Sequence, residues 1–409
     1  MRVLLSTIGS RGDVQPLVAL ALQLRAVGQE VRVCVPPDFR DWIEGLGIAV
    51  TPIGPEVRSF AASRPTAAQP ASPPSAEQRR QLADATVATQ FDTLTAAAHG
   101  CDIIVAATAL QIAARSVAER IGIPYIFAAY SATVLPSPHH PPPPLPGQTT
   151  PGTADHRELW ARDAERFNDL FREALNARRT SLGLAPVSDV RSHMLTERPW
   201  LAADPTLGPW PDPADDRVFQ TGAWMLPDER PLSRELEAFL DTGEPPIYFG
   251  FGSTRASQDT GRAMLGAARA FGRRAIISGG WFDDRLVDSE PDCLAIGEVN
   301  LNALFPRVAA IVHHGGAGTT TAAALAGVPQ VVVPHRYDQH YWARQIPRLG
   351  IGVAHAAEPP TTGSLTRALE QTLTPEVAAR AKSVGAAVRR DGTEIAVKRL
   401  LTGMPVPAP

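Results

Sequence analysis

A short glycine loop near the N-terminus holds the first residues that could do chemistry. It reads Gly9-Ser10-Arg11-Gly12-Asp13 and joins an apolar run to a segment with helical periodicity. The start of such a helix offers free backbone amides and a positive dipole end, which favour an anion. On this motif alone, Asp13 is best interpreted as a cap for the first helical turn. The loop lacks the G-x-G-x-x-G spacing, so a nicotinamide cofactor is not indicated.

A second glycine-rich segment carries two adjacent histidines. It reads His313-His314-Gly315-Gly316-Ala317-Gly318-Thr319-Thr320 and lies between a buried apolar run and an alanine-rich helical pattern. The glycines allow a close approach of the backbone to a ligand, and the helix start supplies N–H groups that suit a diphosphate. The alternative is a plain glycine turn beside a buried histidine. The segment lacks the Gly-Lys-Ser/Thr ending of a Walker A loop.

A carboxylate and a carboxamide follow each other in Pro334-His335-Arg336-Tyr337-Asp338-Gln339. This segment comes after the next predicted strand, so it should end on the same sheet edge as the histidine-glycine loop. Asp338 and Gln339 together could hold several sugar hydroxyls. The alternative is a solvated loop in which Asp338 caps a helix.

Two weaker signals lie on the same half of the chain. Gly250-Phe251-Gly252-Ser253-Thr254 opens a helical segment and could add amides and hydroxyls to a phosphate site. Gly297-Glu298-Val299-Asn300 follows a strand-like run and could line a base pocket. Either segment alone is also compatible with an ordinary turn.

The elements that position these loops alternate between short apolar runs and helical patterns. This rhythm predicts parallel sheets covered by helices on both faces. The first half has predicted strands at 2–6, 31–35, 102–106 and 125–129, with helices at 14–26 and 113–120. The second half has predicted strands at 247–250, 275–278, 309–312 and 330–333, with helices at 260–271, 319–326, 364–373, 376–389 and 394–401.

Two proline-rich stretches interrupt the first half. Residues 64–75 are rich in Pro, Ala and Ser and are expected to be mobile, while residues 136–153 are too rich in proline for a helix or sheet. The second stretch is either a solvated polyproline II loop or a semi-rigid wall of a ligand pocket, since long loops after parallel strands often form pockets. Residues 205–213 resemble an interdomain linker.

Composition sets the remaining limits. A chain of 409 residues with 44% hydrophobic and 20% charged residues suits two globular domains. The net charge of -3 argues against a dedicated nucleic-acid binder. No run of about 18 apolar residues exists, so we expect no membrane-spanning helix. Three scattered cysteines favour a cytoplasmic protein with reduced thiols, and the chain lacks D-x-D, H-E-x-x-H and G-x-S-x-G motifs.

Taken together, the motifs resemble the family 1 glycosyltransferases of GT-B fold. The loop at 9–13, the histidine-glycine loop at 313–320 and the pair at 338–339 carry this resemblance, and segments 199–205, 220–224 and 226–231 resemble the group that glycosylates vancomycin-type antibiotics. The resemblance implies an α/β chain with two Rossmann-like domains facing across a cleft and a C-terminal helix that crosses back. It further implies an inverting, metal-independent reaction.

The resemblance also implies a division of labour between the domains. Residues 1–208 would bind the acceptor, 209–222 would be a linker, 223–390 would bind the nucleotide sugar, and 391–409 would pack back on the first domain. Asp13 matches the position of the general base, which reverses the capping interpretation, and Asp338 matches a second functional carboxylate. The matched donor-binding positions are Ser10, Arg11, Gly12, Gly252, Ser253, Val299, His314, Gly315, Gly316, Gly318, Thr319 and Gln339.

The acceptor is expected to be a small-molecule aglycone, glycopeptide-like or polyketide, that contacts Tyr130, Ser137, His139 and His140. The donor is a UDP- or TDP-sugar used as a substrate, with no further cofactor. The backbone at Val299 would read the base, although the tryptophan that many relatives stack there is absent. Sterol or glycolipid acceptors, a nucleotide-sugar epimerase and a non-catalytic binding module remain alternatives. Either a monomer or a homodimer is compatible with the sequence.

Overall fold

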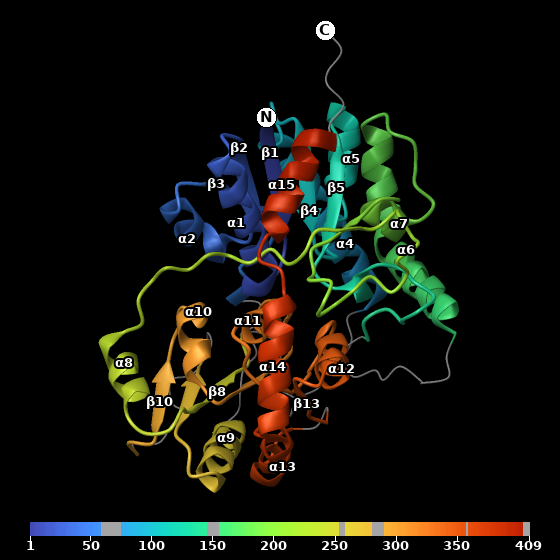
Figure 1. Cartoon of the computed structure of the whole chain (residues 1–409). Helices are drawn as coiled ribbons and strands as arrows, with labels where there is room; N and C mark the ends of the chain where they lie inside the picture. The colour runs from blue at the N-terminus through green and yellow to red at the C-terminus, as the bar shows by residue number, and fades with distance from the viewer. Residues whose placement is uncertain (59–74, 145–154, 253–257, 280–289, 357–358, 404–409) are drawn as a thin grey trace.

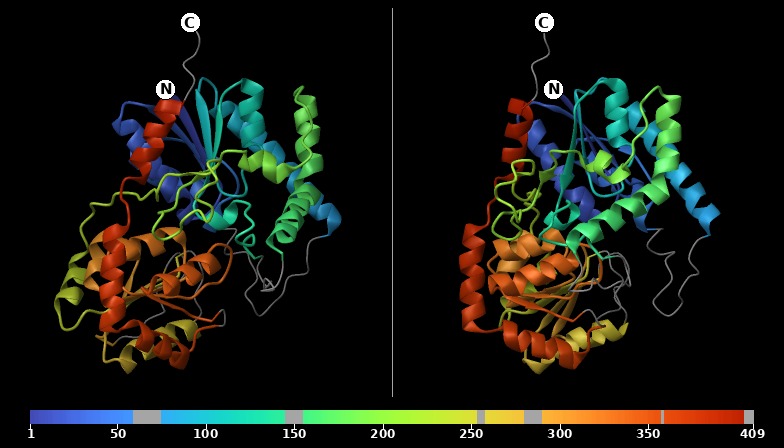
Figure 2. Two further views of the ribbon diagram at one scale, coloured as in Figure 1. Left: turned by 45° about the vertical axis from the view of Figure 1, so that its right-hand side comes forward. Right: turned by 90° about the vertical axis from the view of Figure 1, so that its right-hand side faces the viewer.

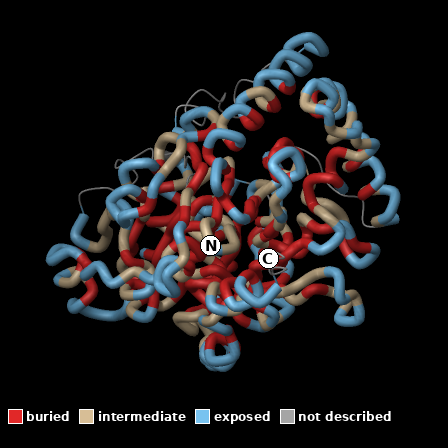
Figure 3. Tube along the Cα trace, turned by 90° about the horizontal axis from the view of Figure 1, so that it is seen from above, coloured by how far each residue is buried: buried red, intermediate tan, exposed pale blue. Residues whose placement is uncertain are grey.

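The computed structural model describes residues 1–58, 75–144, 155–252, 258–279, 290–356 and 359–403. Two α/β domains lie one above the other, each built on its own sheet (Figure 1). Buried backbone gathers in the centre and exposed segments lie around the rim (Figure 3). Among the described residues, no helix has the length and apolar character needed to cross a membrane.

The N-terminal domain is built on a parallel sheet. Its third strand in spatial order, β1 (Arg2–Thr7), lies between β2 (Glu30–Val35) and β4 (Ile103–Ala107). Val3, Leu4 and Leu5 are fully buried because helices cover both faces, as the continuous apolar run predicts. In spatial order the sheet contains β3 (Ala49–Pro52), β2 (Glu30–Val35), β1, β4 (Ile103–Ala107), β5 (Tyr125–Ala129), β6 (Trp200–Leu201) and β7 (Phe219–Gln220).

Helices and short 3-10 turns connect these strands. They are α1 (Arg11–Ala26), η1 (Pro37–Phe39), α2 (Arg40–Gly45), α4 (Ala76–Ala97), α5 (Ala114–Ile121), η2 (Ala132–Val134), α6 (His156–Ser181) and α7 (Val190–Leu195). The long helices α4 and α6 pack against each other and lie outside the pattern that the sequence predicted. Residues 64–74 and 145–153 of the proline-rich stretches are outside the described residues.

The C-terminal domain repeats the same plan. Its parallel sheet has the order β10 (Cys293–Ile296), β9 (Ala275–Ser278), β8 (Ile247–Gly250), β11 (Ala310–His313), β12 (Gln330–Val332) and β13 (Gly352–Ala354). Around it lie α8 (Arg234–Asp241), α9 (Gln258–Ala270), α10 (Leu301–Leu304), η3 (Phe305–Arg307), α11 (Ala317–Leu325), α12 (Gln339–Leu349), α13 (Thr362–Thr372) and α14 (Pro375–Ala387). The four strands and five helices predicted for this half are present within a few residues, counting the tail helix α15 (Gly392–Gly403).

The prediction of a linker at residues 209–222 is partly wrong. Residues 219–220 form β7, which pairs with β6 as the last strand of the N-terminal sheet. A strand of two residues gives almost no periodic signal, and the prolines around it indicated only a loop. The chain therefore leaves the first sheet after Gln220, later than the proline content indicated.

The tail crosses back to the N-terminal domain, as expected. α14 lies on the lower domain and α15 (Gly392–Gly403) lies on the upper one, beside α1 (Figure 2). Ala396, Val397 and Leu400 of α15 are buried in the same apolar cluster as residues of α1. At the crossing, the Asp204 carboxylate accepts a hydrogen bond from the Arg389 amide at 2.9 Å, so both domains are joined to the tail.

We predict that Gly392→Ala weakens the crossing. A Cβ at Gly392 would lie 2.4 Å from the Ala223 carbonyl oxygen, and backbone atoms cannot yield as a flexible side chain would. The free energy of unfolding should fall by about 1–3 kcal/mol in a urea titration. The control is Gly363→Ala in α13, whose added Cβ would meet nothing closer than 3.7 Å. Equal stability of the two variants would contradict the packing argument.

Candidate functional site

The predicted functional loops meet where the carboxyl ends of the two sheets face each other. Asp13 follows β1 at the centre of the first sheet, while His314 and Asp338 follow the adjacent strands β11 and β12 of the second. Helix α1, which carries Asp13, contacts α11 across the domain boundary, and the negative charge of Asp13 raises the pKa of Asp338. The sequence placed each one on a strand-to-helix junction but could not show that they face each other.

Asp13 reaches back over the start of its own helix. The N-cap of α1 is Ser10, and Asp13 is the third helical residue. Its Oδ2 accepts hydrogen bonds from the Ser10 backbone amide at 2.6 Å and from Ser10 Oγ at 3.0 Å. A Cβ at Gly9 would lie 2.2 Å from Oδ2, so only glycine leaves room for the carboxylate there. The capping and catalytic interpretations are therefore compatible, because capping occupies one of the two carboxylate oxygens.

Burial raises the pKa of Asp13, against the lowering effect of its bonds to Ser10 and of the Arg336 charge. A raised pKa makes the ionised carboxylate a stronger base. Tyr130 lies beside it, because its hydroxyl donates to the Asp13 backbone carbonyl at 3.1 Å. Of the predicted acceptor-binding residues, Tyr130 is the one tied to the catalytic candidate.

Arg11 joins the two domains at the other side of the loop. Its guanidinium lies 3.6 Å from the centroid of the Trp42 ring and pairs with Glu298 at 3.1 Å. Burial lowers its pKa, which the Glu298 charge partly offsets. Glu298 belongs to the segment after β10, so the loop at 9–13 contacts the C-terminal domain directly.

The two adjacent histidines have different roles. His313 is fully buried: the Gly315 amide donates to its Nδ1 at 3.1 Å, and its Nε2 lies 2.9 Å from Gln330 Oε1. This pattern fixes the proton on Nε2, and burial lowers the pKa of His313 to about 3. His313 thus holds the loop in place, and His314 faces the site.

Glycines surround the imidazole of His314. A Cβ at Gly316 would lie 2.6 Å from its Nε2, and one at Gly252 would lie 2.9 Å from its Cε1. Burial lowers the pKa of His314 to about 4, so the neutral imidazole offers one N–H donor at neutral pH. Gly315 has a φ of 88°, and its Cβ would collide with Val332 at 2.7 Å, so the turn itself also requires glycine.

The start of α11 completes an anion site. Gly316 is its N-cap and contributes no side-chain hydrogen bond, so the amides of Ala317, Gly318 and Thr319 have no side-chain cap. Gly318 is exposed, with no atom within 4 Å of an added Cβ. Free amides, a positive dipole end and the His314 N–H together suit a diphosphate.

Asp338 and Gln339 begin α12 in unusual ways. Asp338 is the N-cap, yet its side chain makes no capping bond; instead Oδ2 accepts from the Trp342 indole at 3.2 Å. Burial and the Asp13 charge raise the pKa of Asp338 to about 6. Gln339 Oε1 accepts from the backbone amides of His335 and Arg336, at 2.8 and 3.0 Å. Gln339 thus shapes the loop with its oxygen, which leaves its amide group for a ligand.

Arg336 was named in the sequence motif but not assigned a role. In the structure its charge lowers the pKa of both Asp13 and His314, so it lies within reach of residues from both domains. The next residue, Tyr337, has a φ of 54°, which is rare for a residue other than glycine. The strained turn therefore lies immediately before Asp338. In the sequence, the only sign of a role for Arg336 was that it lies in the same segment as Asp338 and Gln339.

A pocket of about 360 Å³ lies at the end of β10. Gly297, Glu298, Val299 and Asn300 line one side, and residues from the start of the C-terminal domain line the other, including Arg230. The Arg11–Glu298 pair lies at this pocket. Val299 therefore lines a cavity.

The other predicted site residues make local contacts or lie outside the described residues. Ser137 Oγ accepts from the His139 amide at 3.1 Å, and His139 is exposed. His140 is 8% exposed and packs edge-on against Trp160 and Trp210. Ser253 is outside the described residues. In the described part of the chain, no group of three or more His, Cys, Asp or Glu side chains is arranged to hold a metal ion.

Comparisons with known proteins agree with this arrangement. Residues 3–137 match the model of the glycosyltransferase family 28 N-terminal domain, and residues 266–396 match that of the erythromycin biosynthesis protein CIII-like C-terminal domain. The chain is 48% identical to the vancomycin aglycone glucosyltransferase of Amycolatopsis orientalis, over 98% of this chain and 97% of that protein. It is 44% identical to the dTDP-epi-vancosaminyltransferase of the same organism, over 94% and 93%. The solved glycotransferase of kitacinnamycin has a TM-score of 0.74 at 20% identity and covers 99% of both chains, which shows the shared fold.

We predict that Asp338→Asn stabilises the protein above neutral pH. The folded-state pKa of about 6 exceeds the ordinary aspartate value of 3.8, so ionisation of Asp338 opposes folding as the pH rises. At pH 8 the free energy of unfolding of the variant should exceed that of the parent chain by about 1–3 kcal/mol. This advantage should shrink as the pH falls towards 4, where Asp338 becomes increasingly protonated in both the folded and the unfolded parent chain. Urea titrations across this range measure it, and a gap that does not vary with pH would contradict the assignment.

Proposed function

The chain belongs to the family of GT-B glycosyltransferases that includes the vancomycin aglycone glucosyltransferase, and on that premise we propose that it moves a sugar from a UDP- or TDP-sugar to a hydroxyl of a natural-product aglycone, with inversion and without a metal ion. The observation that carries the proposal is the pairing of Asp13 with a donor-type edge on the opposite domain. Contacts between α1 and α11 and the Arg11–Glu298 ion pair hold the two parts against each other.

The strand order supports one orientation of the donor. Val299 follows β10, His314 follows β11 and Asp338 follows β12, all at the same edge of the sheet. From β10 to β12 the order β10-β9-β8-β11-β12 contains four steps. Four steps of about 4.8 Å span roughly 19 Å, which suits an extended nucleotide sugar. The base would occupy the pocket at Val299, the diphosphate would lie at His314, and the sugar would reach Asp338 and Gln339.

The chemical step follows from the position of Asp13. Its carboxylate takes the proton from the acceptor hydroxyl while that oxygen attacks the anomeric carbon in line. The carbon–oxygen bond to the diphosphate breaks on the opposite face, so the configuration inverts. The His314 N–H and the amides at the start of α11 stabilise the negative charge that grows on the leaving diphosphate.

The name of the 48% identical relative supports a glycopeptide-like aglycone as the acceptor. The acceptor would approach from the N-terminal domain, where Tyr130 adjoins Asp13. Ser137 and His140 have local partners, so we assign them to the shape of the pocket wall. His139, which is exposed, is available for direct contact.

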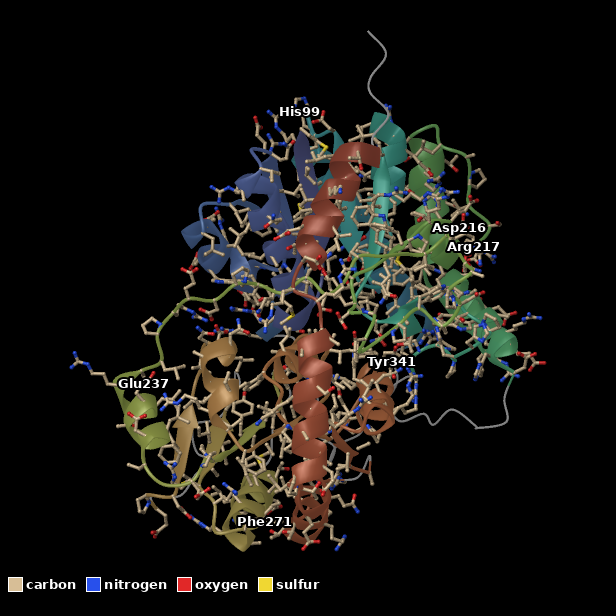
Figure 4. The ribbon with its side chains drawn as sticks, viewed as in Figure 1. His99, Asp216, Arg217, Glu237, Phe271 and Tyr341 are labelled. Carbon is tan, nitrogen blue, oxygen red and sulfur yellow. The ribbon has the colours of Figure 1, made fainter. Side chains whose placement is uncertain are left out.

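The first test is a thermal-shift screen with UDP, TDP and GDP. A ligand at a hundred times its Kd stabilises the folded state by about 2.7 kcal/mol, which raises the melting temperature measurably. We expect UDP or TDP to act selectively and His314→Ala to abolish the shift. His99→Ala is the matched control, because His99 is exposed at the end of the N-terminal domain remote from the boundary (Figure 4). A shift that survives in His314→Ala would remove the diphosphate assignment.

The second test concerns the base. Asp13→Asn should lower kcat by roughly 10²–10⁴-fold while the nucleotide-induced thermal shift is retained. Asp216→Asn, at an exposed position that Figure 4 labels, is the control and should keep full activity. Near-normal turnover of Asp13→Asn with donor bound would exclude Asp13 as the base. Release of an altered sugar from the donor alone, without acceptor, would instead indicate an epimerase.

The same assay checks the stereochemistry and the role of metals. The anomeric proton coupling of the product, compared with that of the donor, should report inversion. Activity should persist in EDTA, and loss of activity that returns with a divalent cation would contradict the metal-independent step.

A further inference from the structure

Trp342 connects the carboxylate of Asp338 to the N-terminal domain. It lies one helical turn after Asp338, and its Nε1 donates to Asp338 Oδ2 at 3.2 Å. The indole is 1% exposed and is among the largest fully buried side chains of the chain. Because Asp338 makes no capping bond to the amides of α12, the bond from this indole is what directs its Oδ2.

The other edge of the indole presses on the N-terminal domain. A Cβ at Gly208 would lie 2.8 Å from Trp342 Cη2 and 3.2 Å from Cζ3. The neighbouring Tyr341 marks the same boundary: Figure 4 shows it on α12 where that helix meets the upper domain, and its hydroxyl would be 3.2 Å from the same Cβ. Leu207 and Trp210 share one apolar cluster with Trp342, so the contact is a packed one.

Gly208 is itself held firmly. Its amide donates to the Asp204 carbonyl at 2.8 Å, and its carbonyl accepts from Gln220 Nε2 at 3.0 Å. Asp204 Oδ1 also accepts from the Leu207 amide at 3.1 Å, and its Oδ2 binds the Arg389 amide. If the two domains moved relative to each other, Gly208 would therefore move as part of a rigid segment. The Trp342 indole would be the side chain that changes position.

We propose that Trp342 is a positioning residue that orients Asp338 toward the donor sugar only when the Gly208 segment is packed against its ring. The inference rests on the proposed function, because Asp338 must contact the sugar for its orientation to matter. Closure of the two domains and recognition of the sugar are then one event. The nucleoside diphosphate, which does not reach Asp338, binds independently of this contact.

The test compares nucleotide sugars with the nucleotides alone. In Trp342→Phe, which keeps an aromatic ring but loses the N–H donor, the Kd for UDP-glucose or TDP-glucose should rise roughly tenfold, as expected for a lost hydrogen bond to a charged group. The Kd for UDP or TDP should not change. Gly208→Ala, which touches neither carboxylate, should show the same pattern, and calorimetry on the full chain measures both.

Two control experiments could contradict the positioning role of Trp342. Trp160→Phe removes another buried indole bond, which is donated to the His140 carbonyl at 2.9 Å, and should leave both affinities unchanged. In an Asp338→Ala background, Trp342→Phe should have no further effect on the affinity for the nucleotide sugar. Equal losses for sugar and nucleotide, or fully additive effects, would overturn the positioning role. If Asp338→Ala alone leaves sugar affinity intact, the sugar contact itself is wrong, and the inference fails with it.

Discussion

Asp13 and Asp338 come from different domains, and each carboxylate is buried where ionisation is costly. Placing two such groups near one another raises that cost, because like charges disfavour each other's ionised form. The surrounding structure compensates on both sides. Ser10 donates two hydrogen bonds to Asp13, Trp342 donates one to Asp338, and the Arg336 charge favours the ionised form of Asp13. The two Rossmann-like halves thus build a site that neither could assemble alone.

The same constraint explains the glycines of the loops. Gly9 leaves room for the Asp13 carboxylate, while Gly252 and Gly316 leave room for the His314 ring. Each loop therefore brings a functional side chain close to its own backbone instead of projecting it into open space. Side chains held in this way lose little freedom when a ligand arrives, and such preorganisation favours both binding and catalysis.

Much of this arrangement was predictable from the sequence. Buried parallel strands such as β1 and β11 are continuous apolar runs, and the loops that follow them have distinctive glycine patterns. The sequence did not predict β7, since two residues carry no periodicity, or the facing of Asp13 and Asp338, since contacts between domains leave no local pattern. No local pattern in the sequence distinguished Trp342. Its indole bond depends on its spacing from Asp338, and its contact with Gly208 depends on tertiary packing.

The crossing of the tail has a consequence for recombination between relatives. The loops proposed to bind the donor lie within one continuous stretch of chain, from β8 to α12, so a hybrid could exchange them as a single block. The tail helix α15, however, completes the core of the opposite domain, so a hybrid with one junction would pair that helix with a foreign α1. Exchange of this block without loss of folding therefore calls for two junctions, and both parents must have Gly208 and Trp342, because the block contains the tryptophan but not the glycine.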